Sequence, residues 1–302
     1  MAGMVRGWLR GAGGGALSQR PFRLLFAART VSALGNRLSP IALAFAVLEL
    51  TGSATDLGIV IAANEAATVV FFLAGGVWAD RFSRSRILFL TDLVQGAAQA
   101  GSAALLLSGT ARIWQLALLA AVYGAANGIW TPALRGVVPS TVSDQHLQQA
   151  NSLLSLSTNT MGIAGPALGG VLVVAGSPGA ALAFDAATFL VSAILVGSMR
   201  LGVVARTDAE SFAAALRSGW QAFRSRQWLW ASVLLFCLGN FLDAGPFYVL
   251  GPIVARVHLG GAGAWATILT AEAIGSVIGS LLALRIRPSR PLLWTNIGWA
   301  VS

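Results

Sequence analysis

FFLAGGVWADRFSRSRILFLTD, residues 71–92, decides the fold of this chain. One apolar segment ends near Ala79 and a second begins near Ile87, so the charged residues between them form a short turn. Two membrane-crossing helices joined by this turn fit the pattern best. Asp80 stands at the negative end of the first helix dipole and Arg84 at the positive start of the second, so each charge is unfavourable on its own helix. We therefore interpret the turn as a latch whose charges interact with one another or with a neighbouring helix.

The turn carries the pattern G-x-x-x-D-R-x-x-R in four residues: Gly76, Asp80, Arg81 and Arg84. This pattern resembles the loop 2-3 signature of the major facilitator superfamily, although Ser83 stands where that family usually has Gly and Ser85 where it has a second basic residue. By the resemblance, Asp80, Arg81 and Arg84 form a conformational latch and not a substrate site. The alternative is that the turn is an ordinary cytoplasmic loop, which is rich in arginine without acting as a latch.

The composition indicates a protein that crosses the bilayer several times. Of 302 residues, 56% are hydrophobic and only 10% are charged, which excludes an ordinary soluble domain. The net charge of +9 comes from 20 basic residues, all of them arginine. Their placement between apolar segments favours the membrane surface over nucleic acid as the partner. The single Cys237 offers neither a disulfide framework nor a metal cluster, and we expect no cofactor.

The apolar segments predict an all-α membrane protein with eight complete transmembrane helices and the start of a ninth near Leu292. Glycines at 52, 109, 176, 260 and 261 mark short turns between segments. Residues 1–21, which are rich in glycine and arginine, are expected to form a cytoplasmic tail and not a cleavable signal. The predicted segments are 23–49, 56–79, 86–108, 113–137, 150–175, 179–199, 229–254 and 263–284.

Arginine placement predicts the orientation, because short cytoplasmic loops carry the excess of positive charge. Only Arg112 and Arg256 fall on the opposite side, while Arg29 and Arg37 lie within the first apolar segment. The N-terminus is therefore expected to be cytoplasmic, in the plasma (inner) membrane of a bacterium. The other sixteen arginines share one side: residues 6, 10, 20, 23, 81, 84, 86, 135, 200, 206, 217, 224, 226, 285, 287 and 290.

A long polar interval, residues 200–227, divides the chain after six helices. Beyond it the beginning recurs: Leu34-Gly35-Asn36 is echoed at 238–240, and Asn64-Glu65-Ala66 at 271–273. Parallel six-helix halves are typical of the major facilitator fold. We therefore expect an N-terminal six-helix bundle over 22–199 and an incomplete C-terminal bundle over 228–302, in a chain truncated at its C-terminus. The alternative is that eight helices are the whole and the repeat is accidental.

The fifth predicted helix contains four small or helix-bending residues: Gly165, Pro166, Gly169 and Gly170. Glycines four residues apart let two helices approach closely, and the proline invites a bend. This segment resembles the G-P-x-x-G-G core of a signature of exporting antiporters in the same superfamily, although Met161 stands where the family has a leading glycine. The resemblance implies export. The alternative is ordinary helix packing.

Ionisable residues inside the hydrocarbon cost roughly 2.5–3.5 kcal/mol each at a helix centre, so each is a functional candidate. Five are candidates for proton coupling or for lining a polar cavity: Arg37, Glu65, Asp185, Asp243 and Glu272. Glu65 and Glu272 occupy equivalent places in the two halves, and Asp243 shares a helix face with Asn240. A plain salt bridge is the alternative for each one. Arg29 also lies within the first helix, and Asp92 is expected to pair with an arginine near the latch.

Catalytic and metal-binding patterns are missing from the sequence, so we do not expect an enzyme. The opening FRLLFAARTVSALGN and the stretch FDAATFLVSA at 184–193 add to the likeness to drug or siderophore exporters of the major facilitator superfamily. The resemblance implies a monomeric secondary transporter that exchanges protons for a small-molecule substrate by alternating access. The alternatives are an importer or lipid translocator on the same fold, or a truncated remnant that does not transport.

Overall fold

A computed structural model of the chain describes residues 15–81, 83–199, 217, 220–221 and 223–283. Within these ranges the chain is helical throughout apart from its short connections. The helices are α2 (Arg20–Thr51), α3 (Ala54–Arg81), α4 (Arg84–Leu107), α5 (Ile113–Val137), α6 (Leu147–Ala175), α7 (Pro178–Gly197), α9 (Gln227–Gly239), α10 (Gly245–His258) and α11 (Ala262–Ala283). Short 3-10 turns lie at Ala16–Ser18, Val138–Ser140 and Asp144–His146.

The eight predicted apolar segments all coincide with helices, which confirms the all-α fold class. The segment predicted at 229–254 is more complex than expected, because a π-helical turn, Asn240–Ala244, joins α9 to α10. Gly52 ends α2 with a φ of 67°, a left-handed conformation that favours glycine, and its N–H donates to the Leu48 carbonyl. The predicted ninth start near Leu292 lies outside the described residues.

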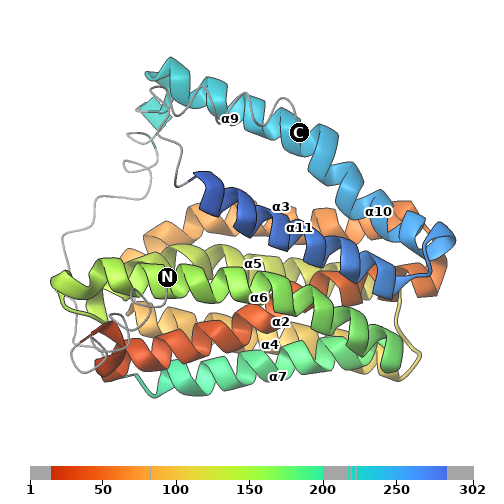
Figure 1. The fold of residues 1–302 in the computed structure, drawn as a ribbon, viewed down its shortest axis with the longest axis horizontal. Coiled ribbons are helices and arrows are strands. Elements are labelled where there is room, and N and C mark those ends of the chain that lie inside the picture. The colour runs from red at the N-terminus through yellow and green to blue at the C-terminus, as the bar shows by residue number, and fades with distance from the viewer. Residues whose placement is uncertain (1–14, 82, 200–216, 218–219, 222, 284–302) are drawn as a thin grey trace.

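Helices α2 to α7 pack into one bundle, which Figure 1 shows as nearly parallel rods. Helix α2 runs through it against α6 and α7, α4 lies against α5 and α7, and α3 lies against α5. Helix α11 lies along α6, whereas α9 extends away from the bundle (Figure 1). Three apolar clusters fill the spaces between helices, around Phe22 and Leu88, around Leu38 and Leu182, and around Leu57.

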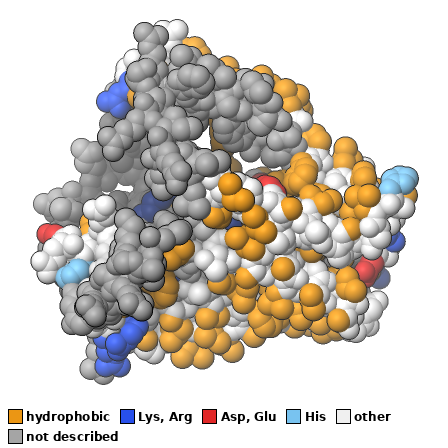
Figure 2. All heavy atoms as spheres, viewed as in Figure 1, with side chains coloured by type: hydrophobic (Ala, Val, Ile, Leu, Met, Phe, Trp, Pro, Cys, Tyr) orange, Lys and Arg blue, Asp and Glu red, His pale blue; other side chains and the backbone are white. Residues whose placement is uncertain are grey.

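The outside of the molecule is apolar, as a lipid-facing surface requires. Large side chains such as Val70, Leu90, Val174 and Ile194 are exposed, and hydrophobic atoms cover much of the face seen in Figure 2. Seven helical stretches in the described part of the chain are long and apolar enough to cross a membrane. Helix α4 is not among them. Its polar residues lie inside the bundle, where they become the centre of the candidate site.

Candidate functional site

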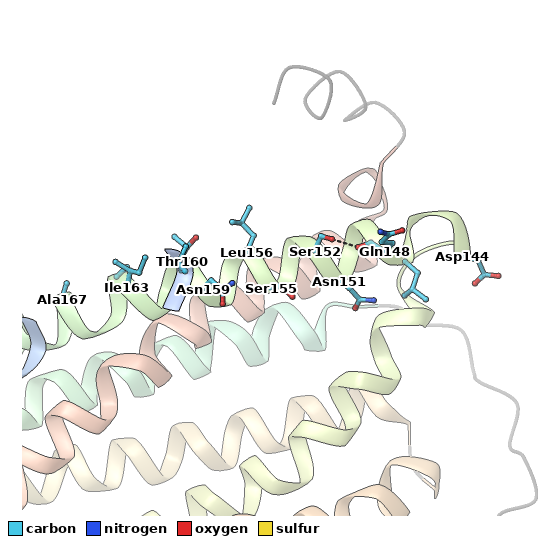
Figure 3. Close-up of a pocket in the computed structure, with 13 residues that line it drawn as sticks. Asp144, Gln148, Asn151, Ser152, Ser155, Leu156, Asn159, Thr160, Ile163 and Ala167 are labelled. Carbon is cyan, nitrogen blue, oxygen red and sulfur yellow. Dashed lines mark hydrogen bonds between the residues drawn. The ribbon is translucent and has the colours of Figure 1, made fainter. Parts of the chain in front are cut away.

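An elongated cavity of about 1220 Å³ lies along one side of α6 (Figure 3). Its wall repeats every three or four residues from Leu147 to Ala167, so it is one face of a single helix, and Val277 of α11 completes it. Among the described residues that line it, Asp144 at one end is the only charged one. The rest of the wall mixes amides and hydroxyls with aliphatic side chains: Gln148, Asn151, Ser152, Ser155, Leu156, Asn159, Thr160, Ile163 and Ala164. Such a wall suits an uncharged or weakly charged amphipathic molecule.

The glycines predicted in this helix place α6 directly against two neighbours. A Cβ atom added at Gly165 would collide with Arg37 of α2, and one at Gly169 would lie 3.0 Å from Leu38 Cβ. One added at Gly170 would collide with Ala266 of α11. Pro166 lies between these contacts and is buried. The motif therefore fixes α6 between the first helix of the bundle and a helix beyond residue 227.

The predicted latch lies at the end of the bundle where α2 and α4 begin. Arg84 Nη1 donates a 2.7 Å hydrogen bond to the backbone carbonyl of Gly136, at the C-terminal end of α5. A cation is favourable there because the helix dipole is negative at that end. Asp80 and Arg81 form the last turn of α3, but their side chains lie outside the described residues. The structure thus gives Arg84 a neighbouring helix as a partner.

The other predicted site residues do not come together. Arg37, Glu65 and Glu272 are exposed side chains on α2, α3 and α11, and none of them has a hydrogen bond or ion pair to another described residue. The side chain of Asp243, in the π-helical turn, lies outside the described residues. Of the four candidates whose side chains the structure describes, only Asp185 of α7 is fully buried, with no exposed surface.

Asp185 lies in a fully hydrogen-bonded setting between three helices. Gln99 Nε2 of α4 donates 2.6 Å hydrogen bonds to Asp185 Oδ2 and to Ser39 Oγ of α2. Thr188 Oγ1 donates to the Asp185 carbonyl at 2.7 Å and approaches Oδ1 at 3.3 Å. A Cβ atom at Gly35 would collide with Oδ1, so this glycine lets the carboxyl group lie against the α2 backbone.

A second buried carboxyl group, Asp92 of α4, was not among the predicted site residues. Ser192 Oγ of α7 donates a 2.6 Å hydrogen bond to Asp92 Oδ2. Arg29 of α2 is close enough to interact electrostatically with Asp92. The side chain of Arg81, in the predicted latch, lies outside the described residues. Arg29 Cζ lies 4.0 Å from the centre of the Trp130 ring of α5, a cation–π contact. The spacing of Asp92, Gln95 and Gln99 on one helix face was the available sequence signal for this group.

The potential metal ligands among the described residues are dispersed. No group of three or more His, Cys, Asp or Glu side chains could hold a metal ion there. The free Cys237 is exposed on α9. His146 lies in the turn before α6, within hydrogen-bonding distance of Ser143 and Gln19.

The chain matches a family of proteins described as transmembrane secretion effectors over residues 13–291. It is 29% identical over 233 residues to the uncharacterized MFS-type transporter YfiS of Bacillus subtilis, covering 74% of this chain and 54% of that protein. It is 27% identical to the enterobactin exporter EntS of Salmonella typhimurium, covering 92% of this chain and 67% of EntS. Identity to macrolide efflux protein A of Streptococcus pyogenes is 26%, covering 86% of this chain and 65% of that protein.

The chain thus spans 54% to 67% of the length of these relatives. Among solved structures, it resembles a bacterial homolog of the human lysosomal transporter Spinster in an inward-facing and occupied conformation. The TM-score is 0.68 at 15% identity, over 88% of this chain and 61% of the other. A structure of the POT family transporter PepTSo gives a TM-score of 0.59 at 14% identity, over 91% of this chain and 56% of the other. At these identities the likeness concerns the fold.

Proposed function

Because this chain belongs to the transmembrane secretion effector family of the major facilitator superfamily, whose members are multi-pass membrane transporters and not enzymes, we propose that it exports a small molecule by alternating access. We further propose that a proton gradient drives the export and that the transporter acts as a monomer. In this proposal it lies in the inner membrane with a cytoplasmic N-terminus.

The cavity along α6 is the observation that carries this proposal. In the proposed orientation, it opens at the cytoplasmic end, because Asp144 and the start of α6 lie beside Gln19 at the start of α2. Apart from Asp144, the described wall is uncharged and amphipathic, and it fits compounds such as the macrolide and the enterobactin that the relatives' names specify. A substrate entering from the cytoplasm would contact α6, which is packed against helices of both halves of the proposed fold.

The proposed organisation follows the sequence. Residues 1–21 would be a cytoplasmic tail, 22–199 a six-helix bundle, 200–227 a cytoplasmic loop, and 228–302 part of a second bundle. Arg37, Glu65, Asp185, Asp243 and Glu272 remain proposed proton or cavity residues. The exposed positions of Arg37, Glu65 and Glu272 are compatible with a water-filled cavity, whereas Asp185 lies inside the bundle.

Transport in reconstituted vesicles tests the proposal directly. The 302-residue chain is placed in liposomes, and movement of a radiolabelled macrolide and of a catecholate siderophore is followed with an imposed pH gradient and after a protonophore collapses it. Export that stops with the gradient supports the proposal. Uptake in the opposite direction, or movement of a fluorescent lipid instead, would establish an importer or a lipid translocator. A folded chain that moves none of these probes overturns the transporter proposal for this chain.

The proposed latch has its own test. Asp80→Asn and Arg84→Gln should each slow transport while the chain still inserts and folds, because the residues act on the balance between conformations. Arg84→Gln removes the donor to the Gly136 carbonyl, a bond from a charged group that contributes about 1.5–3 kcal/mol when well shielded. Arg86→Gln, at an exposed position of the same turn, is the control. Unchanged transport in the first two variants counts against the latch.

A further inference from the structure

Helices α4 and α7 carry matching sets of buried polar residues at the same spacing. On α4 they are Asp92, Gln95 and Gln99, and on α7 they are Asp185, Thr188 and Ser192, so each set follows the i, i+3, i+7 pattern of one helix face. All six side chains are 7% exposed or less. This repetition indicates a continuous polar seam between two helices whose other faces are apolar.

The hydrogen bonds show that the two sets run in opposite directions. Asp92 at the start of one set pairs with Ser192 at the end of the other, and Gln99 pairs with Asp185, each at 2.6 Å. Seven residues of helix separate the two carboxyl groups along each helix, a rise of about 10 Å. The seam therefore holds one carboxyl group at each end, with amide and hydroxyl groups between them.

Helices α2 and α5 close the seam on its other sides. Arg29 of α2 lies beside Asp92 and over the Trp130 ring. Tyr123 of α5 is close enough to interact electrostatically with Asp185, Arg29 and Asp92, and its hydroxyl donates a 2.6 Å hydrogen bond to Asn36 Oδ1. Asn36 is half-buried and precedes the exposed Arg37, so this bond connects the seam to the surface of α2 that adjoins the cavity helix.

The charges in the seam do not balance. Two carboxyl groups, Asp92 and Asp185, face one cation, Arg29, and Tyr123 is the remaining titratable side chain among the described residues that contact them. With both carboxyl groups ionised, the apolar interior would hold an uncompensated negative charge, which is strongly unfavourable. Binding one proton to either carboxyl group removes the excess charge, and a proton on Asp185 leaves the Arg29–Asp92 interaction in place.

We propose that this seam, formed by Asp92, Gln95, Gln99, Asp185, Thr188, Ser192 and Arg29, is the proton-binding site that drives transport. The proton is carried as the O–H of one carboxyl group, Asp185 or Asp92, and leaves that oxygen for water when the bundle changes conformation. The inference rests on the proposed proton-driven export, and it places the coupling proton inside the six-helix bundle. The exposed candidates Glu65 and Glu272 then serve substrate or water.

Measuring both gradient-driven export and substrate exchange distinguishes a variant that has lost proton coupling from one that has failed to fold. Asp185→Asn and Asp92→Asn preserve the shape of each side chain but cannot carry the proton. We expect gradient-driven export to fall by about tenfold or more, within the usual range of coupling between two linked sites. Exchange of labelled for unlabelled substrate at equal pH needs no net proton movement, so it should persist and show that the variants are folded. Asp56→Asn, in the first turn of α3, is the matched control and should keep both activities.

A second measurement covers the case in which the Asn variants do not fold. Ser192→Ala removes one hydrogen bond to Asp92 Oδ2, which favours the ionised carboxylate. The pH profile of export should therefore shift toward higher pH, while Ser198→Ala, an exposed hydroxyl at the end of α7, should leave the profile in place.

The outcomes distinguish the two proposals. If the unaltered protein exports substrate without responding to a proton gradient, both proposals are overturned: export is not driven by protons, and the seam is not the coupling site. If it responds to the gradient and the Asp185→Asn and Asp92→Asn variants respond equally well, only the seam is overturned. The seam is established as the proton-binding site if the Asp185→Asn and Asp92→Asn variants lose gradient-driven export but retain exchange, and if the pH profile of Ser192→Ala shifts as expected.

Discussion

Gly35 illustrates how tightly single residues are specified inside this bundle. Its hydrogen atom occupies the only space between the α2 backbone and the carboxyl group of Asp185, because any Cβ atom there would overlap Oδ1 and Thr188 Oγ1. Membrane helices use small residues in this way to bring polar groups into hydrogen-bonding distance without water. The glycine is thus a condition for the hydrogen bonds among Asp185, Gln99 and Ser39.

Gly35→Ala should destabilise the protein by about 1 to 3 kcal/mol, the usual cost of an extra methyl group in a packed interior. The measurement is thermal unfolding of the detergent-solubilised chain. Gly58→Ala is the matched control, since nothing lies within 4 Å of a Cβ atom at Gly58 of α3. Alanine is a better helix former than glycine by roughly 0.5–1 kcal/mol, so the control should hold or raise the Tm. Equal Tm values for the two variants would contradict the contact at Gly35.

At the scale of elements, α6 is the helix on which the arrangement depends. Gly165 and Gly169 bring it against α2, and Gly170, on another side, brings it against Ala266 of α11. The same helix forms the wall of the cavity. A change in the contact between α6 and α11 therefore alters the shape of the cavity, which is how a substrate and a helix movement can influence each other.

The role of the α6–α11 contact can be tested by moving the methyl group from Ala266 of α11 to Gly170 of α6. Gly170→Ala places a Cβ atom on that of Ala266, so transport and Tm should both fall, with a stability loss of about 1 to 3 kcal/mol. Adding Ala266→Gly to the same chain removes the opposing methyl group and should restore both. Gly162→Ala, with nothing within 4 Å of the new atom, provides the baseline. Failure of the second substitution to rescue the first would show that α6 and α11 do not meet at this pair.

The helices could be predicted from the sequence, whereas the seam between them could not. Hydropathy located all eight segments, and Gly52 and Gly109 marked turns that have positive φ values in the structure. Asp185 was a candidate because a carboxyl group in an apolar segment is conspicuous. Its partners Gln99 and Ser39 are 86 and 146 residues away along the chain, and neutral residues of this kind carry no distinctive pattern. Glu65 and Glu272 were candidates because they are ionisable residues in apolar segments, at equivalent places in the two halves, and neither signal indicates whether a side chain is buried.

On the scale of the whole molecule, the two ends of the described part differ. The arginine-rich end carries the cavity beside α6. At the opposite end, Arg256 at the end of α10 donates to the Leu48 carbonyl, near the C-terminus of α2, and interacts with Glu49. A cation at the negative end of a helix dipole is favourable, so this contact holds α10 against α2. The arrangement matches a conformation that is open on one side and closed on the other.

Removing the Arg256 contact should open the closed end. In a chain that carries Cys237→Ser, Asn159→Cys places a reporter thiol in the cavity wall. An exposed side-chain hydrogen bond contributes about 0.5–1.5 kcal/mol, so Arg256→Ala should raise labelling of this thiol from outside by about two- to tenfold. The reagent is a membrane-impermeant maleimide. Arg112→Ala, the other arginine of that end, is the control, and an equal increase in both variants would mean that Arg256 does not close this face.

The concealed polarity of α4 has a consequence for how the protein is made. With Asp92, Gln95 and Gln99 still unpartnered, α4 is less apolar than the helices that are long and apolar enough to cross a membrane, so we expect it to enter lipid less readily by itself. Ser192, which completes the setting of Asp92, follows 100 residues later, so at roughly 5–20 residues per second the ribosome supplies it about 5–20 s afterwards. We therefore expect α4 to enter the bilayer together with α7, the helix against which its polar face packs.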